Sequence, residues 1–239
     1  MGNSKMNHVK RRRKRRVKTT LLTATLMGAL VVGSIMAYLI DVDSKDGVFQ
    51  FGSSTSIDIS LVEEKGSTGT HKNVMPNETY VKDPAVLNEG TSAAYVFMQV
   101  EVPTAFVETV DADGTKTEAA ETELFNYEVT ELSGWTLIGD AFTKSVKNGA
   151  TIENYVVYTY VYGTEEACQK LDADSSTSTL FDEVNVVNYV GGNEINGKQK
   201  DLVVTAYAIQ TTGLDSTKPE EVWPLLATQA GAAIDIATE

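Results

Sequence analysis

The run from Asn154 to Tyr162 constrains the fold of this chain more than any other segment. It holds four tyrosines, three valines and a threonine in nine positions. Aromatic and β-branched side chains favour strands, and few helices would tolerate so many of them in succession. The run therefore predicts a strand with Tyr155 and Val157 on one face and Tyr158 and Tyr160 on the other.

Alternation with a period of two recurs along the chain and predicts further strands. In Ala94–Val102 the even-numbered residues would line one face and Tyr95 and Phe97 the other, and Pro103 would end the strand. Leu202–Gln210 is apolar on both faces, which is typical of a central strand. The other segments with strand character are Ile57–Leu61, Phe125–Val129, Trp135–Leu137 and Leu180–Val186.

Turn residues at fairly regular spacing separate these segments, as in two-sheet folds. We therefore predict an all-β, antiparallel, two-sheet, jelly-roll-like sandwich that follows an N-terminal signal helix. One or two short helices are expected, a turn within Thr164–Leu171 and a helix at Pro219–Leu226. The sandwich would be one domain of residues 38–239, with a loop insertion around 103–124.

The first 40 residues have the order of an export signal. Nine Lys and Arg residues lie between Lys5 and Lys18 without any acidic residue, and an uncharged run from Thr19 to Ile40 follows. A charged head, an apolar stretch and small residues before a cut define a signal peptide, here 1–37 with cleavage between Ala37 and Tyr38. The uncharged run is long enough to stay in a membrane as an anchor, which is the alternative. Both interpretations place the remaining chain outside the cytoplasm, secreted or at the cell surface.

The exported part is strongly acidic and has one cysteine. From Tyr38 onward the chain carries 11 basic and 33 acidic residues, a net charge of −22. This charge disfavours nucleic acid and anionic membranes as partners, so membrane contact is expected only through the signal segment. Cys168 has no partner for an internal disulfide, so the fold must rest on burial and hydrogen bonding.

A set of short segments follows one order along the chain, namely Ala37–Asp41, Ser44–Asp46, Phe49, Gly52, Ile57–Leu61, Lys82–Gly90, Ala94–Val96, Leu180–Val184 and Ala206–Gln210. Together these segments resemble the TasA and camelysin (CalY) family of exported proteins. The resemblance implies a jelly-roll sandwich and processing near Ala37 by a SipW-like signal peptidase. It also implies assembly into extracellular fibres of a biofilm matrix in some members. The long basic head and the 103–124 segment depart from the family pattern.

Catalytic chemistry has little support in the residues. Camelysin-like proteins are often described as metallopeptidases, but a catalytic zinc commonly takes two or more histidines. This chain has only His8 and His71 and no His-Glu-x-x-His. We therefore expect no catalytic residues, no cofactor and no enzyme activity, with a metallopeptidase as the alternative.

Asp111 and Asp113 are weak candidates for a calcium site. Gly114 follows them at the fourth position of the stretch, whereas an EF-hand loop has its glycine at the sixth. The other interpretation is a turn in which the aspartates cap the local backbone. The tyrosines of Asn154–Tyr162 likewise admit a sugar-stacking face or ordinary cross-strand packing.

The segment after the expected cut predicts how the chain would act. Tyr38–Phe51 has few turn formers and offers several apolar side chains, namely Leu39, Val42, Val48, Phe49 and Phe51. Such a segment could complete the sheet of a second copy, and this head-to-tail contact would build a filament. We therefore predict a secreted, non-enzymatic structural protein. The alternatives are an ordinary first strand of its own sandwich, a monomeric adhesion or binding module, and a membrane-anchored exported protein.

Overall fold

The computed structural model describes residues 40–44, 57–63, 74–130, 132–149, 151–190, 195 and 197–233. The chain divides into two compact units, Met1–Tyr38 and Leu39–Glu239, and every described residue belongs to the second. The predicted signal helix, the Ala37–Tyr38 cleavage site and both histidines lie outside the described residues. Those predictions therefore stay predictions.

The main sheet is built around one long strand, β5 (Ala94–Thr109). Along the sheet the order is β1-β15-β5-β10-β8, and the pairs are antiparallel. The flanking strands are β1 (Ile40–Ser44), β15 (Val203–Gln210), β10 (Thr151–Tyr162) and β8 (Trp135–Leu137). Four more pair with β5 or β10, namely β6 (Ala120–Glu123), β9 (Phe142–Asn148), β11 (Lys170–Leu171) and β14 (Tyr189–Val190).

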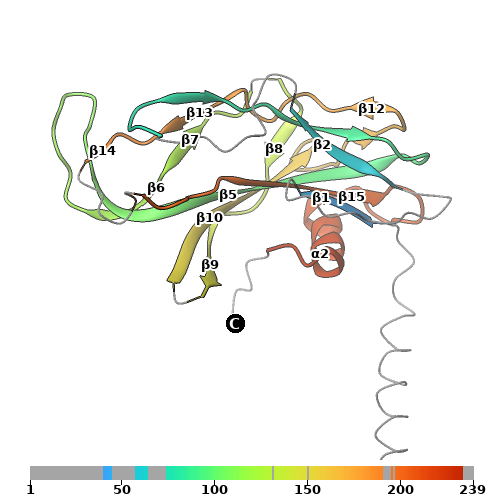
Figure 1. The fold of residues 1–239 in the computed structure, drawn as a ribbon. Coiled ribbons are helices and arrows are strands. Elements are labelled where there is room, and N and C mark those ends of the chain that lie inside the picture. The colour runs from blue at the N-terminus through green and yellow to red at the C-terminus, as the bar shows by residue number, and fades with distance from the viewer. Residues whose placement is uncertain are drawn as a thin grey trace, which may run out of the picture. The chain divides into compact units, whose positions relative to one another are not determined.

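Two three-stranded sheets form the second layer, which lies over one face of the main sheet (Figure 1). The first is β12-β4-β2, with β2 at Ile59–Glu63, β4 at Pro84–Asn88 and β12 at Ser175–Ser176. The second is β3-β13-β7, with β3 at Thr79–Val81, β7 at Phe125–Tyr127 and β13 at Glu183–Val186. The predicted all-β antiparallel sandwich is confirmed.

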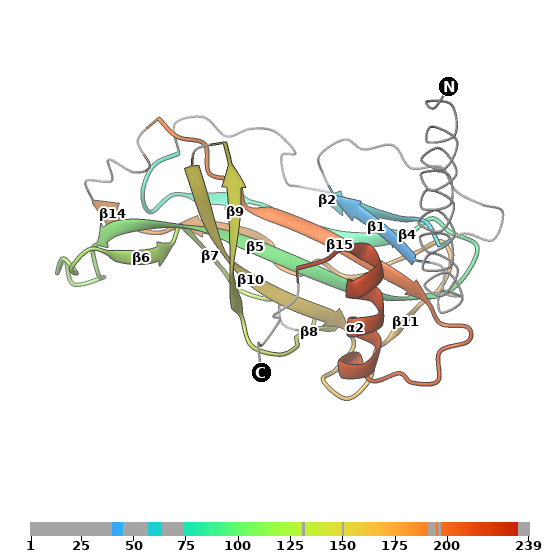
Figure 2. The ribbon, with the colours of Figure 1, turned by 90° about the horizontal axis from the view of Figure 1, so that it is seen from below.

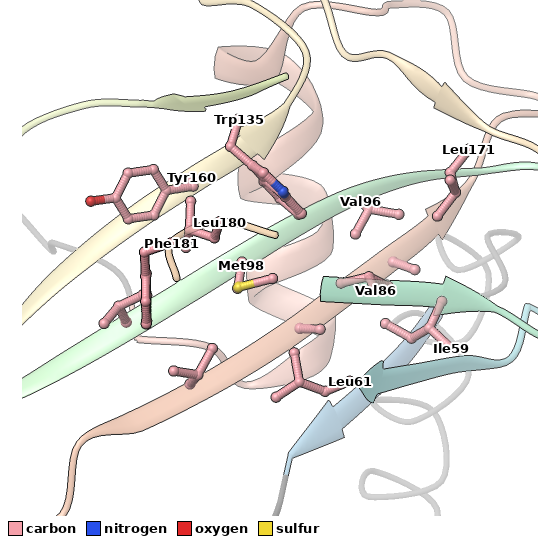
Figure 3. Close-up of a cluster of buried hydrophobic side chains, with 14 of the residues drawn as sticks. Ile59, Leu61, Val86, Val96, Met98, Trp135, Tyr160, Leu171, Leu180 and Phe181 are labelled. Carbon is pink, nitrogen blue, oxygen red and sulfur yellow. The ribbon is translucent and has the colours of Figure 1, made fainter. Parts of the chain in front are cut away.

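The core between the layers comes from the alternation seen in the sequence. Val96, Met98 and Val100 are fully buried on the inner face of β5, and Phe181 and Leu180 pack over them from the second layer (Figure 3). The main core cluster also contains Ile57, Ile59, Leu61, Val86, Val102, Trp135, Tyr160, Leu171, Val184 and Ala206. Period-two alternation therefore identified the buried face of β2 and the face of β5 that lies toward the second layer, although β5 is buried on both faces as far as Ala105.

Pro103 does not end its strand, contrary to the expectation from the sequence. β5 continues to Thr109. The Pro103 carbonyl accepts a hydrogen bond from the Leu124 N–H at 3.0 Å, so the nitrogen of Pro103 faces the same edge of the strand. On that edge the pairing with β15 stops at Glu101 and the pairing with β6 begins at Thr104. The missing N–H of proline therefore falls where the ladder changes partner.

The segment 103–124 is a β-hairpin and not the loop insertion expected from its polar residues. Its strands are the end of β5 and β6, joined through a turn at Asp111–Gly114, where Gly114 has a φ of 85°. Facing threonines support the hairpin, since the Thr109 and Thr117 hydroxyls lie 2.8 Å apart. A polar segment can form a strand here because β5 supplies the partner backbone.

The helical turn expected within Thr164–Leu171 is also wrong. Gly163 bridges Cys168 in an antiparallel pair, and Lys170–Leu171 form strand β11 against the start of β5. Gly163 has a φ of 142°, a value that L-residues rarely adopt, and this turns the chain back on itself. Burial of Leu171 against the core fixes the extended form.

One helix lies among the described residues, α2 (Pro219–Ala230), where Pro219–Leu226 was predicted. Pro219 starts the helix, and Gly231 ends it with a left-handed φ of 68° and an N–H that donates to the Ala227 carbonyl. α2 covers the face of the main sheet opposite the second layer (Figures 1 and 2).

Candidate functional site

The predicted donor segment contributes an edge strand, β1, to the main sheet. Ile40 lies opposite Ile209, Val42 opposite Tyr207, and Ser44 opposite Thr205, all within one chain. This arrangement is the alternative of an ordinary first strand. Val42 is the one donor candidate that the structure describes; Leu39, Val48, Phe49 and Phe51 lie outside the described residues. Donation of this strand to a second copy stays a prediction.

β15 explains why a strand is needed at this edge. Six of its eight residues are buried, and β5 pairs along its whole length on one side. Without β1, the other side of β15 would present unpaired N–H and C=O groups beside a hydrophobic core. Such an edge is a template for any strand that reaches it. The edge of β15 is therefore the candidate functional site of the described chain.

An aromatic cluster holds α2 over this site. The Trp223 ring lies 5.3 Å from the Phe97 ring and 5.5 Å from the Tyr207 ring, measured between centroids. The buried side chains of Val222 and Leu226 extend the contact. Figure 2 shows α2 crossing the sheet at β15 and β1, and the helix lies against both strands. Burying Val222 and Leu226 contributes about 1.5–3 kcal/mol each.

A buried polar network lies beside the cluster. The Gln99 amide nitrogen donates to the Thr159 hydroxyl at 3.0 Å and to the Ala233 carbonyl at 2.7 Å. The Tyr207 hydroxyl donates to the Gln99 amide oxygen at 3.3 Å. Gln99 is fully buried, and these bonds satisfy its amide group. The network connects β5, β10 and β15 with Ala233, in the segment that follows α2.

Electrostatics at the site favour the neutral phenol of Tyr207. Burial raises the pKa of Tyr207 to about 12, and the negative charge of Glu101 adds to this effect. Glu101 is itself paired, because Lys144 donates to both carboxylate oxygens at 2.7 and 2.8 Å. Tyr207 therefore acts here as a hydrogen-bond donor with an apolar ring.

The calcium candidates lie in the turn of the β5–β6 hairpin. The Asp113 carboxylate accepts a hydrogen bond from the Thr115 N–H at 2.9 Å, and this bond lowers the pKa of Asp113. The Asp111 carbonyl accepts one from the Gly114 N–H at 2.9 Å. The Asp113 side chain therefore caps the local backbone, as the turn interpretation expects, whereas Asp111 contributes its backbone carbonyl to the turn. Within the described ranges no three His, Cys, Asp or Glu side chains gather as metal ligands would.

The tyrosines of β10 pack against their neighbours. Tyr160 is buried, its hydroxyl lies 3.0 Å from that of Tyr127, and the Tyr158 hydroxyl donates to Glu123 at 2.8 Å. The Tyr127 ring stacks on Phe181 with centroids 4.5 Å apart. These contacts join β10 to β7 of the second layer and to β6, so packing within the sandwich describes this cluster. Burial raises the pKa of Tyr127 and of Tyr158.

Cys168 is buried, and burial raises the pKa of its thiol to about 12. The sequence analysis did not single out Trp223 or Gln99, the two residues that connect α2 and the chain end to the sheet. Gln99 had a visible signal, since it is the one uncharged polar residue in the apolar run of Ala94–Val102.

Over the residues that the structure covers, no helix has the length and apolar character of a membrane span.

These features define an all-β sandwich protein with a short strand at the edge of its main sheet. Comparisons with models of protein families, with curated proteins and with solved structures found no match.

Proposed function

We propose that this chain is a secreted, non-enzymatic structural protein of the cell surface or biofilm matrix, which assembles with copies of itself. Residues 40–44 of one copy would pair with β15 of the next copy, in the register that they have with their own β15. The resemblance to the TasA and camelysin family supports this proposal, as does the signal-like N-terminus. A SipW-like peptidase would release the strand by cleaving between Ala37 and Tyr38.

The observation that carries the proposal is the position of β1. It is an edge strand of five residues that begins just after the expected cut, and it covers the edge of a strand that is otherwise buried. Exchange of an identical element between copies recreates the same pairing without a new interface. Each copy would offer one strand and one edge, so head-to-tail donation from each copy to the next would build a filament, whereas reciprocal exchange would close a dimer.

The test compares two chains, one starting at Tyr38 and one starting at Ser53. Light scattering and electron micrographs are recorded for each at equal concentration. We expect filaments from the first chain and none from the second. A peptide of residues 38–52 should bind the second chain with one-to-one stoichiometry, because it restores the missing strand. Monomers from both chains would reject the proposal and favour a monomeric adhesion module.

Processing is tested separately in the producing cell. An Ala37→Glu variant should accumulate as the uncut chain in membrane fractions, because signal cleavage requires a small residue at this position. An intact N-terminus in the wild-type chain would instead support the anchored alternative. A purified chain that cleaves casein, with the activity lost on chelation and in His71→Ala, would support the metallopeptidase.

A further inference from the structure

Helix α2 touches the strand that the proposed function would exchange. β1 lies against three elements, namely β15, β2 and α2. The helix crosses the outer face of the sheet at the β15–β1 edge (Figure 2). β1 therefore cannot leave β15 without also losing its contact with α2.

Three described contacts fasten α2 to parts of the chain other than β1. The Trp223 ring packs on Phe97 and Tyr207, which belong to β5 and β15. Before the helix, the Thr217 carbonyl accepts a hydrogen bond from the Cys168 N–H at 2.7 Å. After the helix, the Ala233 carbonyl accepts a hydrogen bond from the Gln99 side chain at 2.7 Å. The helix is thus fixed to the sheet through Trp223 and Ala233, and through Thr217 to the turn that contains Cys168.

We propose that α2 is a latch that sets the rate at which β1 leaves and re-enters the β15 edge. A 12-residue helix is marginal in water, so α2 would lose its structure when it leaves the sheet. Its partner at this site is β1, first of its own chain and then residues 40–44 of a second copy. This role in assembly rests on the proposed function, but the latch itself belongs to the single chain.

The latch affects the rates at which β1 leaves and re-enters the edge, and not the equilibrium between unassembled and assembled protein. When identical copies exchange β1, each edge loses one strand and gains an identical one, and α2 covers it in both states. Loosening α2 therefore speeds release of the strand from the monomer and from the polymer alike. The protein concentration that remains unassembled at equilibrium should change little.

The test is hydrogen exchange on the monomeric chain starting at Tyr38, followed by mass spectrometry. Trp223→Ala removes the ring that contacts Phe97 and Tyr207. Leu225→Ala is the matched control, because this side chain on the same helix is 42% exposed. We expect amides of residues 40–44 to exchange at least tenfold faster in Trp223→Ala and at the wild-type rate in Leu225→Ala. Amides of β5 should stay protected in both variants.

A second variant strengthens the helix. Pro224 is exposed inside α2 and cannot donate to the Glu220 carbonyl, whereas alanine can. Pro224→Ala should slow exchange of residues 40–44. If the β5 amides also exchange faster in Trp223→Ala, this variant has lost its fold, and Pro224→Ala is the deciding variant. Slower exchange of residues 40–44 in Pro224→Ala then supports the latch, and unchanged exchange of these residues overturns it. Faster exchange of α2 without any change in residues 40–44 also overturns it.

Assembly kinetics separate the latch from the proposed function. If the wild-type chain forms filaments, Trp223→Ala should shorten the lag before assembly and leave the final concentration of unassembled protein unchanged. A changed final concentration with an unchanged lag would contradict the latch. If the wild-type chain forms no filaments, the proposed function fails. The exchange of residues 40–44 in the monomer still decides whether α2 holds the strand.

Discussion

Phe181 offers the clearest test of how this sandwich is held together. The side chain is fully buried, stacks on Tyr127 at a centroid distance of 4.5 Å, and packs against the inner face of β5 beside Leu180 (Figure 3). Phe181 itself lies outside the strands, in the residues just before β13, and its side chain reaches the core from there. Phe181→Ala would leave a cavity between the two layers.

The expected loss in the free energy of unfolding is about 3–5 kcal/mol. Phenylalanine-to-alanine changes in cores fall in this range, because lost transfer energy and the residual cavity both contribute. A domain of this size loses about 2–4 °C in melting temperature per kcal/mol, which predicts a drop of roughly 6–20 °C. The stability of a typical domain is about 5–15 kcal/mol, so the variant should still fold in the cold.

The assay is urea denaturation of the chain starting at Tyr38, followed by circular dichroism and by tryptophan fluorescence. Phe106→Ala is the matched control, because this phenylalanine is 54% exposed on the hairpin. It should change stability by about 0.5 kcal/mol or less. A loss below about 1 kcal/mol in Phe181→Ala, or equal losses in both variants, would refute the assignment of Phe181 to the core.

Three further predictions concern single positions. Gly163→Ala should cost about 2–6 kcal/mol or abolish folding, because backbone strain at a φ of 142° adds to the overlap of the new Cβ with the Ala167 carbonyl oxygen, 2.3 Å away. Gly114→Ala, in open space, should cost only about 1 kcal/mol in the same denaturation assay. Leu132→Gly should raise stability by about 0.5–1 kcal/mol, since Leu132 is fully exposed at a φ of 59° and loses no packing; a lower urea midpoint would contradict this. The Cys168 thiol should resist alkylation at pH 8 until urea unfolds the chain. Because its pKa rises from 9.0 to about 12 on folding, the stability gained by keeping it protonated is present below pH 9 and lost as the pH rises toward 12. The gap in stability between wild type and Cys168→Ala should therefore shrink above pH 9, and a constant gap would be inconsistent with this shift.

Strands whose residues alternate strongly could be predicted from the sequence. β10 and β15 were found within a few residues of their bounds, because aromatic and β-branched side chains fit a pleated, half-buried surface whatever lies beside it. The central position of β15 also followed, since both of its faces are apolar. For α2, the prediction stopped at Leu226, although the chain had a readable stop signal at Gly231.

Features that depend on a distant partner could not be predicted. Pro103 is tolerated because the ladder changes partner beside it, and β6 is a strand because β5 lies next to it. β9 contains two lysines, and the pairing of Lys144 with Glu101 joins positions 43 residues apart. At the candidate site the apolar residues and few turn formers of Tyr38–Phe51 indicated a strand. It did not indicate that β15 would be its partner or that Trp223 would hold a helix over both.

The pairing of Ile40 with Ile209 has a consequence for how the chain reaches its native state. The main sheet joins the first described strand to the last one, so its closure needs contacts that are far apart in sequence, and such sheets form slowly. In the export that we propose, the residues after the signal cross the membrane in chain order, so this sheet cannot be complete until Gln210 has emerged. We expect the exported chain to stay unfolded throughout its passage and to close the sheet only outside. The β1 strand of the same chain and the β1 strands of neighbouring chains would then compete to pair with a newly formed β15. The local density of emerging chains would therefore decide which β1 strand pairs with it.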